Sequence, residues 1–241
     1  MSKSWFSMRA SGGPVGELQI FSDIGGGGVT SEAFHAELSR MRARGVKTLI
    51  ISINSDGGDV PIGFHIFNML ERFPAKKIVR IDGLAASMAS VIAMVGDEII
   101  MPSNAMMMIH NPWGGVAGSV EQIESFGTAL KTMRENIVGA YAKRTRLAVD
   151  QIRAMMDKET WLSAEEAVRL GFADRIEAPL KMAAMASLPD VSRFKNAPTR
   201  ARGIAAIRAD IFDKFNRKSE TSPGGQRRYL TKDERWEYGD S

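Results

Sequence analysis

The chain has 241 residues, of which 44% are hydrophobic and 25% charged, a composition typical of a globular protein with one sizeable core. It contains no cysteine, which excludes disulfides, thiolate catalysis and cysteine-ligated metal sites, and no apolar run is long enough for a transmembrane helix. The net charge of +4 lies in the tail, because residues 189–241 contain 12 Lys and Arg against 8 Asp and Glu; we expect a solvated tail rather than a nucleic-acid site.

Predicted strands and helices alternate through most of the chain. Runs of β-branched and apolar residues predict strands, and apolar residues at helical spacing predict helices. We expect strands at 17–21, 48–53, 77–81, 98–101 and 105–109, and helices at 31–41, 62–70, 88–95, 120–143 and 163–170. This alternation predicts an α/β fold.

The pattern divides the chain into three regions. Residues 1–16 are expected to be a flexible N-terminal segment, residues 17–182 a folded domain, and residues 183–241 a basic, partly disordered C-terminal extension. Within the extension, residues 200–218 fit either a basic amphipathic helix that binds a partner or a marginal surface helix. Residues 222–228 have the composition of a linker.

A histidine and a serine are the strongest candidates for chemistry. His35 and His65 lie in helical patterns and are interpreted as structural or surface residues, whereas His110 ends a strand before a glycine-rich loop. Ser87 lies at a sharp turn from a strand into a helix, where unpaired N–H groups can stabilise an oxyanion. The position resembles a nucleophile elbow without the Gly-x-Ser-x-Gly pattern, and Ser87 taken alone fits a helix N-cap.

Other polar residues complete the set of candidates. The turn at residues 54–58 contains two adjacent glycines, whose N–H groups can serve as oxyanion donors or dock an extended peptide. Ser55 and Ser90 are weaker candidates for a nucleophile. A catalytic triad also needs an acid to orient the histidine, and Asp157 and Glu159 are the candidates.

These pieces resemble the proteolytic subunit of the caseinolytic (Clp) protease family. The similarity covers roughly residues 15–178 and rests on four ordered motifs: Ile53-Asn54-Ser55-x-Gly57-Gly58, Gly83-x-Ala85-Ala86-Ser87-Met88-Ala89-Ser90, Met108-Ile109-His110-x-Pro112-x-Gly114-Gly115, and Leu162-Ser163-Ala164-x-Glu166-Ala167 with Gly171-x-x-Asp174. The resemblance implies a ClpP/crotonase-like spiral of repeated β-β-α units. It makes residues 17–182 a serine peptidase domain and residues 120–143 its long handle helix.

The resemblance also implies a catalytic triad. Ser87 is the nucleophile and His110 the general base. The family has an Asp just before the Leu-Ser-Ala motif, and in register that position holds Glu159 here, with Asp157 as the alternative acid.

The remaining implied site positions are backbone donors and substrate contacts. The N–H groups of Gly58 and Met88 are expected to form the oxyanion hole, and Gly57, Pro112 and Gly114 to bind substrate. No metal and no organic cofactor is implied.

The expected partners are peptide substrates and further copies of the chain. The resemblance implies a ring of seven, single or stacked as a double ring, and the absence of a P-loop motif means that any ATP-driven unfolding needs a separate AAA+ unfoldase. Asp56 in place of the family's usual proline, together with the basic tail, resembles the phage head-maturation (prohead) proteases. Phage scaffold and capsid proteins are therefore the expected substrates. We expect a cytoplasmic protein with no membrane partner, in the host cytoplasm if phage-encoded.

Alternative functions remain open at this point. The chain fits a housekeeping Clp peptidase subunit working with an ATP-dependent unfoldase, or a catalytically silent structural ring. A crotonase-like acyl-CoA hydratase or isomerase is disfavoured, because that chemistry generally uses pocket carboxylates rather than a Ser–His pair. A Ser–Lys dyad is disfavoured because no lysine lies within an obvious motif.

Overall fold

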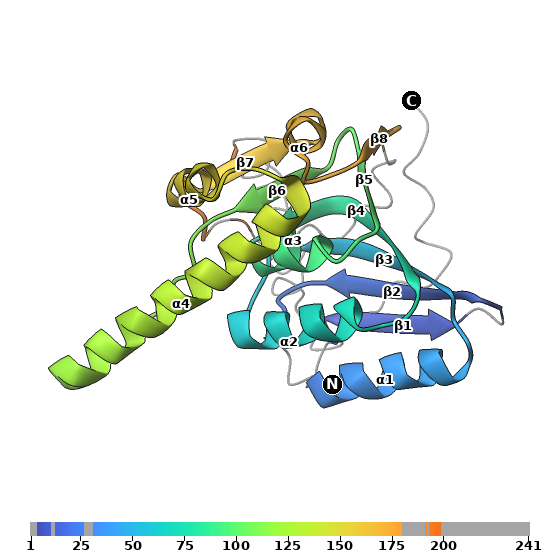
Figure 1. Ribbon diagram of the computed structural model, residues 1–241, viewed down its shortest axis with the longest axis horizontal. Helices are drawn as coiled ribbons and strands as arrows, with labels where there is room; N and C mark the ends of the chain where they lie inside the picture. The colour runs from blue at the N-terminus through green and yellow to red at the C-terminus, as the bar shows by residue number, and fades with distance from the viewer. Residues whose placement is uncertain (1–3, 11–12, 27–30, 180–190, 192, 199–241) are drawn as a thin grey trace, which may run out of the picture.

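A single branched sheet organises the computed structural model, which describes residues 4–10, 13–26, 31–179, 191 and 193–198 (Figure 1). Among these residues the strand order is β1-β2-β3-β4-β5-β8, with β6 pairing with β4 and with β7. The strands are β1 (Phe6–Ala10), β2 (Val15–Phe21), β3 (Thr48–Ser55), β4 (Lys76–Ala86), β5 (Glu98–Pro102), β6 (Met106–Ile109), β7 (Thr160–Ser163) and β8 (Arg175–Glu177). Within the described part of the chain, antiparallel pairing is confined to β1 with β2 and β6 with β7.

Strand β4 is the branch point of the sheet. Its first half pairs in parallel with β5, in the register Ile78↔Glu98, and its last residues pair in parallel with β6, in the register Leu84↔Met106. Since β3, β4 and β6 run in the same direction, their carboxyl ends lie at one edge of the sheet, which is where ligands bind in open α/β folds.

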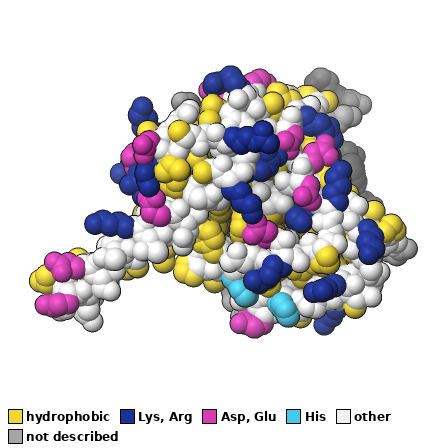
Figure 2. All heavy atoms as spheres, in the orientation of Figure 1, with side chains coloured by type: hydrophobic (Ala, Val, Ile, Leu, Met, Phe, Trp, Pro, Cys, Tyr) yellow, Lys and Arg dark blue, Asp and Glu magenta, His cyan; other side chains and the backbone are white. Residues whose placement is uncertain are grey.

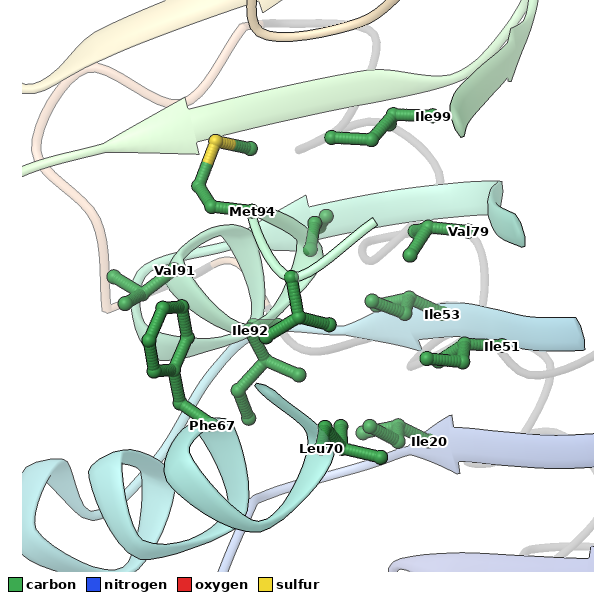
Figure 3. Close-up of a cluster of buried hydrophobic side chains, with 14 of the residues drawn as sticks. Ile20, Ile51, Ile53, Phe67, Leu70, Val79, Val91, Ile92, Met94 and Ile99 are labelled. Carbon is green, nitrogen blue, oxygen red and sulfur yellow. The ribbon is translucent and has the colours of Figure 1, made fainter. Parts of the chain in front are cut away.

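The helices complete the fold and bury the main core. They are α1 (Ser31–Ala43), α2 (Val60–Glu71), α3 (Met88–Ala93), α4 (Val120–Thr145), α5 (Val149–Asp157) and α6 (Ala164–Leu170). Side chains of α2 and α3 form one buried cluster with the strands. In Figure 3, Leu70 of α2 lies beside Ile20 of β2, and Phe67 lies beside Val91 and Ile92 of α3. No helix in the described part of the chain is long and apolar enough to span a bilayer.

Helix α4 projects from the body (Figures 1 and 2). It starts at a capping box formed by Ser119 and Gln122, and its buried residues, Ile137, Val138, Tyr141 and Thr145, all lie near its C-terminal end. The rest of the helix has little contact with the described core, so one end anchors a long arm.

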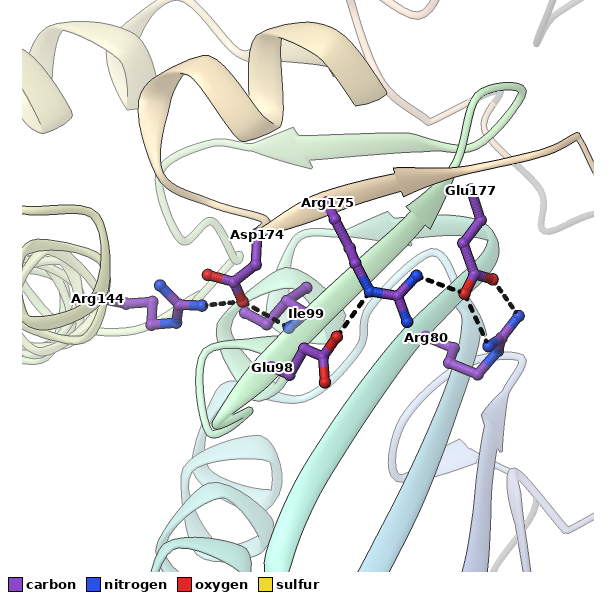
Figure 4. Close-up of polar contacts among 7 residues, drawn as sticks. All are labelled: Arg80, Glu98, Ile99, Arg144, Asp174, Arg175 and Glu177. Carbon is purple, nitrogen blue, oxygen red and sulfur yellow. Dashed lines mark hydrogen bonds and ion pairs between the residues drawn. The ribbon is translucent and has the colours of Figure 1, made fainter.

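A polar network attaches the last strand to the sheet (Figure 4). Glu177 on β8 accepts a 2.6 Å hydrogen bond from Arg80 on β4, and Arg175 donates to Glu98 on β5 at 2.7 Å. Asp174 accepts from the Ile99 amide at 2.7 Å. These contacts hold β8 on the sheet at the point in the chain where the family motifs end.

The observed elements confirm the predicted α/β fold, with differences at short segments. Strand β1 lies inside residues 1–16, which the sequence suggested to be flexible, and pairs over its whole length with β2. The predicted helix 88–95 ends at Ala93, while β4 continues to Ala86. The expectations for residues 200–218 and 222–228 lie outside the described residues.

Candidate active site

Ser87 occupies a strained turn between β4 and α3. Its φ of 54° and ψ of −127° lie in a region that non-glycine residues rarely adopt, and such conformations cluster at functional sites. The Ser87 amide donates to the Met108 carbonyl at 3.0 Å, which ties the turn to β6. Ser87 does not cap α3 with its side chain; instead its Oγ lies 2.8 Å from Nε2 of His110.

His110 follows β6 directly and has a partly buried ring. Burial lowers the pKa of His110, because the charged imidazolium loses hydration; the Glu159 carboxylate opposes this shift and Arg193 adds to it. A lowered pKa keeps the imidazole neutral near pH 7. The structure thus brings the predicted nucleophile and base together with the hydrogen bond that general-base catalysis needs.

The Gly57–Gly58 turn lies against Ser87. Gly57 has a φ of 102°, and a Cβ there would lie 2.6 Å from the Ser87 Cβ and 3.0 Å from the Met88 amide nitrogen. Gly58 has a φ of 148° and forms an isolated bridge with Ile24, whose carbonyl oxygen lies 2.2 Å from the position of an added Cβ. Only glycine fits either position, and the turn leaves space beside the Met88 N–H.

A buried pair of hydroxyls lies behind the turn. Ser90 Oγ lies 2.6 Å from the Ser87 carbonyl oxygen, 3.0 Å from the Met108 carbonyl oxygen and 2.8 Å from the Tyr141 hydroxyl. Burial strongly raises the pKa of Tyr141, so the phenol stays protonated. Ser55 is also fully buried and donates to the Ser22 carbonyl at 2.5 Å. Ser55 and Ser90 therefore support the turns around Ser87.

Neither candidate acid is hydrogen-bonded to His110 within the described residues. Glu159 accepts from the amides of Lys195 and Asn196, at 3.1 and 2.6 Å, and from the Trp161 indole at 3.4 Å. The exposed Asp157 accepts from Asn111 Nδ2 at 2.8 Å and from Arg134 at 2.7 Å. The identity of the triad acid stays a prediction, although Glu159 is close enough to influence the titration of His110.

The predicted substrate loop follows His110 and leads to α4. Pro112 is partly buried and Gly114 is exposed, and a Cβ on Gly114 would lie 2.8 Å from the Phe126 ring on α4. Trp113 between them is 69% exposed. His35 and His65 lie exposed on α1 and α2, as expected for surface histidines. The described residues contain no group of three or more His, Asp or Glu side chains placed to hold a metal ion.

Sequence reasoning missed two residues that reach this site from beyond the four motifs, Arg193 and Phe194. Phe194 is buried with its ring edge-on to His110, at a centroid distance of 5.5 Å. Arg193 donates to the Asp56 carbonyl at 2.8 Å and pairs with the Asp56 carboxylate at 3.0 Å. Neither residue belongs to a motif, and nothing in the sequence signals its contact with residues far away along the chain.

The comparison with protein families supports the geometric interpretation. The model described as Clp protease matches residues 28–179, which include the Gly57–Gly58 turn, Ser87 and His110. The chain belongs to the Clp protease family. Membership in the Clp protease family implies a serine-type peptidase, and the mixed α/β architecture is consistent with the ClpP-like fold. The match ends before Phe194, so the segment that contacts His110 lies outside the part that the family model describes.

Proposed function

We propose that this Clp protease family member is a serine endopeptidase in which Ser87 attacks the peptide carbonyl and His110 is the general base. The observation that carries the proposal is the 2.8 Å contact between Ser87 Oγ and His110 Nε2 at a strained strand-to-helix turn. An isolated N-cap serine would have neither the histidine partner nor the positive φ.

The proposed mechanism uses only side chains and backbone amides. His110 Nε2 accepts the Ser87 proton as Oγ bonds to the carbonyl carbon, and the N–H groups of Gly58 and Met88 stabilise the oxyanion. His110 then donates this proton to the leaving amine, and the peptide C–N bond breaks. Water then attacks the acyl carbon as it gives a proton to His110, the bond from that carbon to Ser87 Oγ breaks, and His110 returns the proton to Oγ. Glu159 is proposed as the carboxylate that stabilises the imidazolium.

Labelling with a fluorophosphonate probe tests the active serine. We expect an adduct on Ser87, located by mass spectrometry, that disappears in Ser87→Ala and falls at least about 100-fold in rate in His110→Ala. The matched serine control is Ser39→Ala, an exposed position on α1, which should label like the wild type. An adduct elsewhere, or none on a folded protein, would refute the activated serine.

We further propose that the chain assembles into rings through the loop after His110 and the projecting end of α4. The support is exposed apolar surface: Trp113, Val120 and Ile123 are 69, 66 and 50% exposed, which is costly unless a partner covers them. The proposed assembly is a ring of seven, single or double, as the resemblance to the family implies, and it would enclose the active sites.

For the substrates, we propose phage scaffold and capsid proteins processed during head assembly. This rests on departures from the common family pattern, above all Asp56 beside the two glycines and the basic extension. Incubation with unprocessed capsid and scaffold proteins, with and without an ATP-dependent unfoldase, tests it against a housekeeping role. Cleavage that requires the unfoldase and ATP would favour the housekeeping role.

A further inference from the structure

Residues 193–197 lie directly against the proposed catalytic residues. Phe194 packs edge-on to the His110 ring at 89° and edge-on to Trp161 at 74°, with a centroid distance of 5.8 Å to Trp161. Phe194 is 3% exposed, although it lies in an extension beyond the part of the chain that the family model matches. A large apolar side chain from beyond the part of the chain that the family model matches thus fills space beside the proposed general base.

Phe194 belongs to a buried apolar cluster separate from the main core. On β4 the side chains alternate, so that Ala85 faces the main core while Leu84 and Ala86 face the other side of the sheet. That other side holds a second cluster: Leu84, Ala86, Met108, Val191, Phe194 and Ala197, with Met106 and Trp161 at its border. Phe194 therefore packs on the strands that position Ser87 and His110.

Polar contacts fix the segment on both sides of Phe194. Arg193 binds the backbone and the carboxylate of Asp56, the residue before Gly57, and its guanidinium also lies 5.1 Å from the centre of the Phe194 ring. On the other side, the amides of Lys195 and Asn196 donate to the Glu159 carboxylate. The segment thus holds, by two hydrogen bonds, the carboxylate of Glu159, the residue in register with the family's triad acid.

We propose that residues 193–197 act as an intramolecular latch, in which Phe194 occupies a substrate subsite beside His110 and the following amides keep Glu159 bonded away from His110. The substrate subsite takes an aromatic side chain, and the ligand class is a peptide with arginine immediately before that aromatic residue, because Asp56 binds the guanidinium. Release of the latch opens the subsite and frees the Glu159 carboxylate to accept a hydrogen bond from His110 Nδ1. The latch deepens the proposed peptidase function and rests on it for its kinetic consequences.

Labelling kinetics give the first test. Phe194→Ala and Arg193→Ala should each speed fluorophosphonate labelling of Ser87, by about tenfold for Phe194→Ala. Each substitution removes contacts that exist only when the latch is bound, so the population of protein with the latch released rises. Phe194→Leu, which keeps an apolar side chain, should lie between wild type and Phe194→Ala. Matched controls are Ile176→Ala on β8 and Arg42→Ala on α1, which should label like the wild type.

The direction of the change decides between roles for Phe194. If Phe194 merely steadies the His110 ring, Phe194→Ala will label more slowly than the wild type, and a slower or unchanged rate refutes the latch. Arg193→Ala keeps the test valid if Phe194→Ala misfolds, because the Arg193 side chain is 34% exposed and lies outside the apolar cluster.

A binding experiment separates failure of the latch from failure of the peptidase. The probe is a fluorescein-labelled octapeptide with the sequence of residues 191–198, added to full-length Ser87→Ala protein, which cannot form an acyl-enzyme. Fluorescence anisotropy should show that the peptide binds about tenfold more tightly to the triple variant Ser87→Ala/Arg193→Ala/Phe194→Ala than to Ser87→Ala. In the triple variant the native segment no longer competes with the peptide. A peptide with alanine at the position of Phe194 should not bind. Equal binding by the two proteins, or none, refutes the latch whether or not Ser87 is active.

Discussion

Ser90 and Tyr141 show how much of the site depends on residues that need not touch substrate. The Ser90 hydroxyl contacts two backbone carbonyls, and each of these carbonyls also accepts a hydrogen bond from a backbone amide. The Ser90 hydroxyl also forms a hydrogen bond with the buried Tyr141 hydroxyl. Removing Ser90 therefore leaves mainly the phenol unsatisfied, and an unsatisfied buried hydroxyl is costly.

Ser90→Ala should lower the free energy of unfolding by about 1–3 kcal/mol, measured by urea denaturation. Tyr141→Phe removes the same bond without leaving a buried phenol and should cost less. The double variant should lose less unfolding free energy than the sum of the losses in the two single variants, because the shared hydrogen bond is lost only once. Strict additivity would contradict the buried hydrogen bond.

Gly57 tests the space beside the Met88 amide. Gly57→Ala places a methyl group against Ser87 and should reduce the rate of Ser87 labelling by about 100-fold or more, the effect of losing an oxyanion donor. Gly45→Ala is the matched control, since Gly45 also has a positive φ, 73°, but an added Cβ would meet nothing within 4 Å. Both variants should lose stability to backbone strain, so equal labelling rates for them would count against the proposed oxyanion hole.

His110 sets the pH dependence of the proposed reaction. Burial lowers the pKa of His110, so the labelling rate should fall on acidification with a midpoint below pH 6.5, the ordinary pKa of histidine. This fall is the acid limb of the pH profile. Glu159→Gln removes a charge that raises the pKa of His110 and should move the limb to lower pH, whereas Glu17→Gln on β2 should not move it. A limb at higher pH in Glu159→Gln would contradict the electrostatic role of Glu159.

At the scale of elements, helices and strands with a strong local pattern were predictable from the sequence. Very short strands and contacts between residues far apart in the sequence were not. The apolar run of β3 and the apolar spacing of α2 predict those elements directly, since burial of apolar side chains determines both patterns. Strands β7 and β8 have four and three residues, too few for a periodic signal. The Ser87–His110 pair was predictable from motifs, but the bonds from Lys195 and Asn196 to Glu159 join residues 36 and 37 apart in the sequence and left no local trace.

The packing of α2 on α3 gives a prediction at this scale. A Cβ on Gly63 of α2 would lie 2.1 Å from the Met88 side chain, the first residue of α3. Gly63→Ala should therefore destabilise the fold and slow Ser87 labelling, since it displaces the residue whose amide is proposed as an oxyanion donor. Gly127→Ala on α4 meets nothing within 4 Å and should instead stabilise by about 0.5–1 kcal/mol, the usual gain in helix propensity. Thermal denaturation should show a lower melting temperature for Gly63→Ala and a higher one for Gly127→Ala than for the wild type.

At the scale of the whole molecule, the projecting N-terminal part of α4 lacks buried residues of its own in the described structure, whereas its C-terminal end belongs to the core. The 26 residues of α4 correspond to about 39 Å of helix, and among the residues that the structure describes only its last turns are anchored in the core. Figure 2 shows hydrophobic and acidic side chains at its far end. An arm of this kind gains stability only if a neighbour packs against it, because isolated helices in water are marginal.

The double variant Val120→Asp/Ile123→Asp tests that dependence on a neighbour. Both side chains are at least half exposed in the protomer, so the substitutions should leave protomer stability nearly unchanged while placing charge in the proposed interface. We expect wild-type protein to sediment as an oligomer and the variant as smaller species, with Val149→Asp on α5, an exposed apolar position away from α4's far end, as the control. A wild-type protein that sediments as a monomer, or an assembly indifferent to these charges, would mean that α4 does not join the protomers. If instead assembly is lost and Ser87 labelling falls with it, the active site depends on the neighbour that α4 engages, because neither substitution touches Ser87, His110 or the glycine turn.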